Sequence, residues 1–152
     1  MSKAIYFDMD GTIADFYGVD NWLEYLINSD VFPYENAKPL VNMSILARYL
    51  NKLQKAGYTI GIVSWLSKNG TIEYNNAVAE TKQKWLKKHL KSVQFDEINI
   101  VKYGTPKSTV CNIPEGILFD DEENNRLEWN EQGVSYEVRF ILNVLRGLVK
   151  AV

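Results

Sequence analysis

The stretch YFDMDGTI, residues 6–13, sets an apolar run directly before two aspartates and then a glycine and a threonine. Asp8 and Asp10 stand where a buried strand is expected to end, with a single methionine between them. Two carboxylates roughly 4 Å apart repel by about 4 kcal/mol at the effective dielectric near a protein surface. A positive group is therefore expected to lie between them.

The composition is that of one ordinary folded domain. The chain has 152 residues, of which 46% are hydrophobic and 12% aromatic, enough to bury a core. Seventeen basic against nineteen acidic residues give a net charge of -2. No overall field therefore attracts nucleic acid or an anionic membrane, and a small anionic ligand would need local cations.

Targeting signals and disulfides are not expected. Cys111 is the single cysteine, so no internal disulfide can form, and the opening MSKAIYFD is too charged for a signal peptide. No apolar run approaches the roughly 20 residues of a membrane span, and the closest stretch, residues 140–149, is broken by Asn143 and Arg146. We expect a soluble, cytoplasmic protein without a membrane partner.

Short apolar runs alternate with helical patterns along the chain. The predicted strands are residues 4–7, 58–63, 97–101, 116–119 and 134–138. The predicted helices are residues 20–28, 45–56, 71–90, 106–111, 122–131 and the last dozen residues. This alternation predicts an α/β fold, a doubly wound, Rossmann-like parallel sheet with helices on both faces. We expect a single domain, residues 1–152, with a small helical cap insertion at about 15–38, after the first strand.

Ligands of such folds bind beyond the carboxyl ends of the strands. Asp8 and Asp10 follow the first predicted strand, Ser64 ends the second, and Asp120 and Asp121 end the run GILFDD. Each has an ordinary explanation when taken singly, because aspartate and serine are common turn and cap residues. Together, acidic groups that a parallel sheet brings to one edge predict a hard-oxygen site that suits Mg²⁺.

The same residues resemble the motifs of a known family. FDMDGT resembles the first motif of the haloacid-dehalogenase-like (HAD) phosphohydrolases. Ser64, Lys107 and the pair 120–121 stand in the order of its second, third and fourth motifs, and the resemblance spans residue 4 to about 125. Within the family, FDMDGTIADF, IVSWLSK, the KSTV run and ILFDD look most like the 5'(3')-deoxyribonucleotidases.

The resemblance implies a phosphatase that works through a covalent intermediate. Asp8 would be the nucleophile that forms an aspartyl phosphate. Asp10 would be the general acid for the leaving alcohol and then the base for the attacking water. Mg²⁺ would be held by the Asp8 side chain, the Asp10 backbone carbonyl and the aspartate pair, with Asp121 favoured over Asp120 as the direct ligand.

The resemblance also implies a phosphate cradle. Ser64 and neighbouring backbone amides, at Gly11 and Trp65, would hold phosphoryl oxygens. Lys107 would neutralise charge on the nucleophile and on the transferring group. Lys102, five residues earlier, is the alternative; Pro106 favours Lys107, because it would set a helix start near the phosphate.

The predicted cap insertion is rich in aromatic residues. These side chains can simply pack the insertion onto the core. Alternatively, one or two of them, with Phe16, Tyr17 and Trp22 preferred, can stack on a nucleobase. A small phosphorylated substrate is expected, first a (deoxy)nucleoside monophosphate. Another phosphometabolite or a nucleic-acid end is the alternative, because the site should be rather open.

Two interpretations from other functional classes compete with an enzyme. A receiver-like signalling domain also places acidic residues, a phosphorylatable aspartate and a lysine on such a sheet. Its acidic pair comes first, however, whereas here the pair comes last and the acceptor is followed by a second aspartate. A relative that only binds a phosphorylated ligand is the other interpretation, and the complete set of motifs argues against it.

Overall fold

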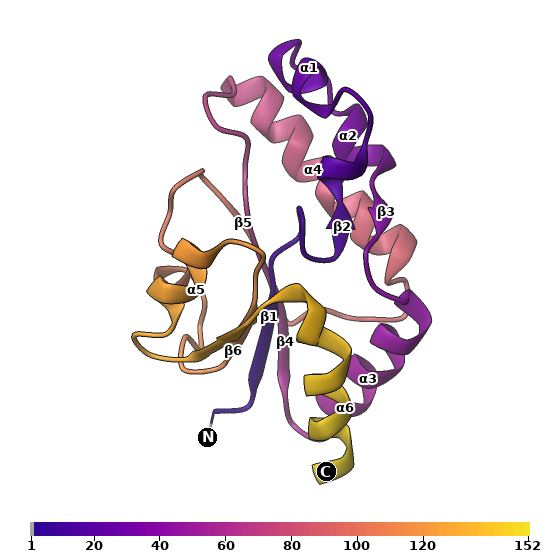
Figure 1. Ribbon diagram of the computed structural model, residues 1–152, viewed down its shortest axis with the longest axis vertical. Helices are drawn as coiled ribbons and strands as arrows, with labels where there is room; N and C mark the ends of the chain where they lie inside the picture. Colours follow the sequence, from indigo (N-terminus) through magenta and orange to yellow (C-terminus); the bar gives the residue numbers. More distant parts are fainter. Residues whose placement is uncertain (1) are drawn as a thin grey trace.

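The computed structural model describes residues 2–152, and its centre is a parallel sheet (Figure 1). The order of the strands is β5-β4-β1-β6-β7, and each neighbouring pair is parallel. The strands are β1 (Ala4–Phe7), β4 (Thr59–Trp65), β5 (Glu97–Val101), β6 (Ile117–Phe119) and β7 (Val134–Tyr136). A short antiparallel ribbon joins β2 (Ala14–Asp15) to β3 (Lys38–Pro39). The predicted doubly wound parallel sheet is confirmed.

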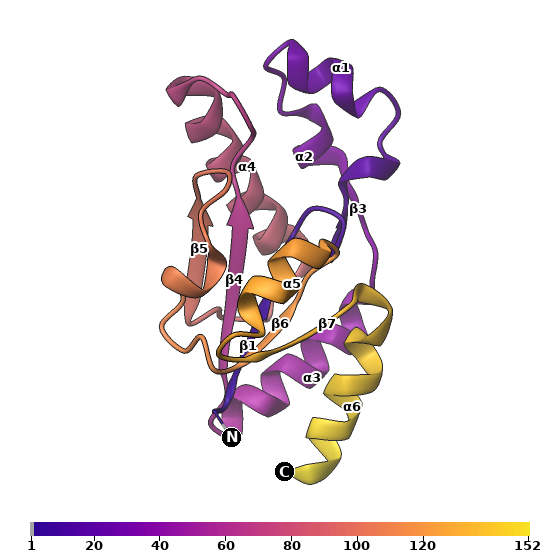
Figure 2. The same cartoon turned by 60° about the vertical axis from the view of Figure 1, so that its left-hand side comes forward.

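Helices cover both faces of the sheet (Figure 2). They are α1 (Trp22–Ile27), α2 (Phe32–Asn36), α3 (Met43–Lys55), α4 (Ile72–His89), α5 (Glu123–Trp129) and α6 (Ile141–Ala151). None of the helices within residues 2–152 has the length and apolar character needed to cross a membrane.

The alternation of side chains along β1 explains the two layers. Ile5 and Phe7 lie in one core cluster with residues of α3, α4 and α6. Ala4 and Tyr6 point to the other face, where the Tyr6 ring meets Trp129 of α5 edge-on at 5.5 Å. Because successive side chains of a strand point to opposite faces, a fully buried apolar strand needs helices on both sides.

One of the predicted helices is wrong, because the segment forms a 3₁₀ turn and not an α-helix. Residues 106–111 contain only a single 3₁₀ turn, Lys107–Thr109, instead of the expected short helix. The N–H of Ser108 donates to Glu128, and the Thr109 hydroxyl donates to the Pro106 carbonyl at 2.6 Å. These side-chain bonds replace the helical ladder. The segment therefore turns tightly enough to send the Lys107 side chain into the sheet edge.

The segment between β2 and β3 lies beyond the carboxyl ends of the strands, at the opposite end of the molecule from both termini (Figure 1). Its helix α2 packs against α4, which extends past the sheet, and α1 packs against α2. Phe16 and Tyr34 from this segment form a buried cluster with Tyr74 and Val78 of α4. The segment and the first part of α4 thus lie next to the carboxyl ends of the strands, where the predicted site residues are found.

Candidate active site

Asp8 occupies the end of the central strand β1. Its backbone N–H donates to the Phe119 carbonyl at 3.0 Å, which fixes the residue beside β6. Its carboxylate is buried, with Oδ1 2.9 Å from Lys107 Nζ and Oδ2 2.9 Å from the Thr12 hydroxyl. Two donors thus hold the side chain in one orientation. The Thr12 hydroxyl braces it from within the same loop.

The loop after Asp8 is closed by its own backbone. The N–H groups of Thr12, Ile13 and Ala14 all lie 3.0 Å from the Met9 carbonyl oxygen. Gly11 has φ +79°, and a side chain there would collide with the Asp121 carboxylate. Its N–H donates to the Ala14 carbonyl at 2.8 Å, and the role of Gly11 in holding phosphate stays a prediction. Gly11 provides the turn that carries Asp10 over the cavity.

Lys107 is the positive group expected beside the aspartates. Its side chain is 1% exposed, and Nζ lies 2.9 Å from Asp8 and 2.6 Å from Asp120 Oδ2. Burial alone would lower the pKa of Lys107, but the two carboxylates outweigh it and the pKa is raised. The alternative, Lys102, is exposed. The structure therefore places Lys107, and not Lys102, against Asp8.

The two aspartates after β6 have different surroundings. Asp120 is fully buried, and its carboxylate accepts hydrogen bonds from Lys107, from the Asn125 amide and from the Glu122 N–H. Asp121 lines the cavity instead. Burial, together with the charge of Asp8, raises the pKa of Asp121 to about 8 and that of Asp120 to about 6. Asp121 is the member of the pair that a bound ion can reach, and Asp120 holds Lys107.

These carboxylates fit Mg²⁺. Oxygens of Asp8, Asp120 and Asp121 all lie within 4.8 Å of one another. Lys107 pairs with Asp8 and Asp120, whereas burial and the charge of Asp8 still raise the pKa of Asp121. A set of carboxylate oxygens with excess negative charge suits a hard divalent cation better than a soft one.

Ser64 and Asp10 meet at a lysine that the sequence analysis did not single out. Lys82 Nζ lies 2.7 Å from Ser64 Oγ, 3.0 Å from Asp10 Oδ2 and 2.7 Å from the Trp65 carbonyl oxygen. Burial raises the pKa of Asp10, and Lys82 partly opposes this shift. A signal for Lys82 did exist: it lies four residues after Val78 and four before Leu86, in the buried stripe of α4.

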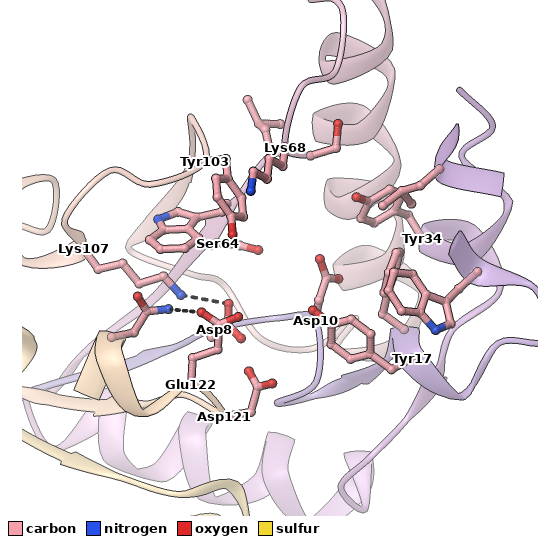
Figure 3. A pocket seen from close by; sticks show the side chains of 17 residues that line it. Asp8, Asp10, Tyr17, Tyr34, Ser64, Lys68, Tyr103, Lys107, Asp121 and Glu122 are labelled. Carbon is pink, nitrogen blue, oxygen red and sulfur yellow. Dashed lines mark hydrogen bonds and ion pairs between the residues drawn. The ribbon is translucent and has the colours of Figure 1, made fainter. Parts of the chain in front are cut away.

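A cavity of about 280 Å³ lies above these residues (Figure 3). Trp65 and Tyr103, with ring centroids 4.9 Å apart, line one side, and Lys68 Nζ lies 5.7 Å from the Tyr103 ring. Tyr17 and Trp22, 5.0 Å apart, line the opposite side. Trp65 lines this wall of the cavity, and the contribution of its backbone amide to phosphate binding stays a prediction. Tyr103 was not predicted, because a tyrosine in a loop after a strand carries no distinctive signal.

The three aromatic residues preferred for stacking differ in accessibility. The Phe16 side chain is 2% exposed and packs on Tyr34 with a centroid distance of 4.7 Å. Tyr17 is 49% exposed. Trp22 is partly buried, and its ring contacts the rings of both Phe16 and Tyr17. Phe16 is thus mainly a core residue, whereas Tyr17 lines the cavity and remains accessible to solvent.

Comparison with known proteins shows a similarity of fold and no match of sequence to a known family. No family model matches the sequence, and no curated protein matches it either. A solved structure with a similar fold is the D,D-heptose 1,7-bisphosphate phosphatase from Burkholderia thailandensis, with a TM-score of 0.51 and 13% sequence identity. The match covers 88% of this chain and 75% of that chain. It agrees with the parallel sheet and flanking helices described above.

Proposed function

We propose that this protein is a Mg²⁺-dependent phosphomonoesterase of the HAD family that works through an aspartyl phosphate. The observation that carries this proposal is the position of Asp8, a buried carboxylate at the end of the central strand that faces a cavity beside Lys107. The FDMDGT motif and a fold shared with a phosphatase support it.

In the first step, an Asp8 oxygen attacks the phosphorus atom, and the bond from phosphorus to the leaving oxygen breaks. Asp10 gives its proton to the leaving oxygen, which departs as an alcohol. Burial raises the pKa of Asp10, so the carboxyl holds a proton more readily than an exposed aspartate does. Lys107 and Thr12 keep the Asp8 carboxylate in place for in-line attack.

In the second step, water attacks the phosphorus atom of the aspartyl phosphate. The Asp10 carboxylate takes a proton from that water, and the bond from phosphorus to the Asp8 oxygen breaks. Inorganic phosphate leaves, and both aspartates return to their starting states. A second carboxyl that can act as acid and then as base distinguishes this site from a long-lived phosphate signal.

The charge of the transferring group is met by several residues. Lys107 and Ser64 line the cavity, where the ammonium group and the hydroxyl would contact the phosphoryl oxygens. The Asp8 side chain, the Asp10 backbone carbonyl and Asp121 would hold Mg²⁺, with Asp120 behind them. When bound, the ion neutralises charge shared by the nucleophile and the phosphoryl oxygens.

For the substrate we propose a (deoxy)nucleoside monophosphate. Aromatic rings on opposite sides of the cavity, Tyr17 with Trp22 and Trp65 with Tyr103, offer stacking surfaces for a base. Residues 15–38 would act as the small cap of a single domain. A phosphorylated sugar is the second candidate, since the protein of similar fold is named a heptose bisphosphate phosphatase. The lone, buried Cys111 suits a cytoplasmic location.

The test is hydrolysis of 4-nitrophenyl phosphate by the purified protein with Mg²⁺, followed by a screen of nucleotides and sugar phosphates. We expect turnover with Mg²⁺ that stops in excess EDTA and returns when Mg²⁺ is restored. Turnover that persists in EDTA contradicts the metal requirement. A protein that binds Mg²⁺ but hydrolyses no phosphomonoester contradicts the enzymatic function.

A further inference from the structure

Lys82 is a buried cation for which the mechanism above has no role. It lies in the middle of α4, and its side chain is 1% exposed. Asp10, Ser64 and the Trp65 carbonyl surround its ammonium group. An ammonium group has three N–H donors and no acceptor, so these three oxygens satisfy it fully. A buried lysine with a complete set of partners has one fixed orientation.

We propose that Lys82 is a positioning residue that directs the Asp10 carboxyl and the Ser64 hydroxyl toward the transferring phosphoryl group. The proposal rests on the proposed phosphatase function. It differs from the role of Lys107, which contacts the nucleophile and Asp120. Lys107 thus contacts the nucleophile Asp8, and Lys82 contacts the proton donor Asp10.

The contact with Ser64 determines where the hydroxyl proton goes. Because Lys82 can only donate, Ser64 Oγ must accept, at 2.7 Å. A hydroxyl carries a single proton, and this contact does not use it. Ser64 lines the cavity, so its O–H is free to donate to a phosphoryl oxygen there. Without the ammonium group, the hydroxyl proton could turn back toward the Trp65 carbonyl or Asp10.

The contact with Asp10 distinguishes its two oxygens. Oδ2 accepts from Lys82 at 3.0 Å, whereas Oδ1 has no hydrogen-bond partner within residues 2–152. Figure 3 shows the Asp10 side chain projecting into the cavity between Asp8 and Tyr34. Lys82 therefore leaves Oδ1 as the oxygen that exchanges a proton with the leaving group and with water.

Lys82 acts through these residues and does not contact the substrate itself. It is not part of the cavity wall, because Asp10 and Ser64 lie between it and the cavity. The Tyr34 ring, which also lines the cavity, covers the ammonium group, with its centroid 5.3 Å from Nζ. The ring keeps water away from the ammonium group. Because electrostatic interactions are stronger where water is excluded, this strengthens the contacts of Lys82 with its three oxygen acceptors.

The test compares two substrates that differ in their need for a proton. In Lys82→Met, we expect kcat/KM for ethyl phosphate, with its poor leaving group, to fall by about 10²-fold more than kcat/KM for 4-nitrophenyl phosphate. The matched control is Lys84→Met on the same helix, where Lys84 is 73% exposed and should change neither value. Equal losses for both substrates would mean that Lys82 is only structural, and would overturn the proposal.

A double variant makes the link to Asp10 explicit. In an Asp10→Asn background, Lys82→Met should leave the ratio of the two kcat/KM values nearly unchanged, because the proton donor is already absent. A further large fall in that ratio would overturn the proposal. Inactivity of the wild-type protein toward both substrates would instead defeat the phosphatase function.

Folding is checked by circular dichroism and thermal unfolding. If Lys82→Met does not fold, the same comparison is made with Lys82→Gln, which keeps two N–H donors at the site. Failure of both variants to fold would assign Lys82 to stability and would overturn its positioning role.

Discussion

Lys107 Nζ lies 2.9 Å from Oδ1 of Asp8, although 99 positions separate the two residues in the chain. The same ammonium group lies 2.6 Å from Asp120, so one buried cation joins the end of β1 to the end of β6. The negative charge of Asp8 at the end of β1 is therefore balanced by a buried ammonium group, as the first motif led us to expect.

Removal of the Lys107 charge should affect both activity and stability. Lys107→Met leaves two buried carboxylates without their cation, and loss of one partner from a buried ion pair costs about 3–5 kcal/mol. We expect a lower melting temperature and a fall in kcat/KM of at least about 10²-fold. The control is Lys102→Met, since Lys102 is exposed five residues earlier. Unchanged kcat/KM in a folded Lys107→Met protein would contradict the role.

Asp8→Asn and Asp10→Asn should fail in different ways. Asp8→Asn removes the nucleophile and should lower turnover by several orders of magnitude without any phosphorylated species. Asp10→Asn keeps the nucleophile, so a substrate with a good leaving group should still phosphorylate Asp8, and the intermediate should accumulate. Intact mass spectrometry and burst kinetics with 4-nitrophenyl phosphate measure this. Absence of the adduct from both variants, with equal residual rates, would contradict the division of labour.

Metal binding should depend on pH in a direction set by the aspartate pair. The pKa of Asp121 is raised to about 8, so the folded, metal-free protein holds this proton more tightly than the unfolded chain does. Stability of the metal-free protein should therefore fall as the pH rises from about 4 toward 8. Because Mg²⁺ competes with protons, the gain in melting temperature on its addition should be larger at pH 8 than at pH 5.

Asp121→Asn provides the matched variant for this pH dependence. It removes one of the repelling charges, so the metal-free protein at pH 8 should melt about 2–4 °C higher, which corresponds to roughly 1 kcal/mol for a domain of this size. The response to Mg²⁺ should become much smaller. A variant that keeps the full pH-dependent response to Mg²⁺ would show that Asp121 is not the ligand.

Much of the site could be predicted because a parallel sheet brings the carboxyl ends of its strands to one edge. Asp8, Ser64 and Asp121 follow or end three strands of this sheet, and their closeness follows from topology alone. Lys107 lies in a turn outside the sheet, and only the resemblance to a family singled it out. Its burial depends on the 3₁₀ turn that replaced the predicted helix.

The contacts of Lys82 could not be predicted, because the burial of a single side chain on α4 depends on which residues of other segments cover it. Thr71–Leu90 reads as a lysine-rich amphipathic helix, and most lysines remain solvated. Lys82 is buried because Tyr34 of the segment between β2 and β3 covers it while Asp10 and Ser64 supply acceptors. Those partners come from three separate parts of the chain, so no local pattern reveals the contact.

The last prediction concerns the choice of substrate, and Tyr17 tests it best. Tyr17 lines the cavity and is 49% exposed, so its ring can contact a base without first leaving a core. Stacking of a base on an aromatic ring is worth about 1–3 kcal/mol. Tyr17→Ala should therefore lower kcat/KM for a deoxyribonucleoside monophosphate by about 5- to 150-fold, with a much smaller loss for 4-nitrophenyl phosphate.

Three further variants separate stacking from packing. Trp22→Ala should share the selective loss, since Trp22 also lines the cavity beside Tyr17. Phe16→Ala should instead lower the melting temperature and affect both substrates alike, because Phe16 is buried against Tyr34. Tyr25→Ala is the aromatic control, because Tyr25 stacks on Phe32 away from the cavity. If Tyr17→Ala and Trp22→Ala lower kcat/KM for both substrates equally, these rings serve only to pack the segment, and the nucleotide assignment loses its physical support.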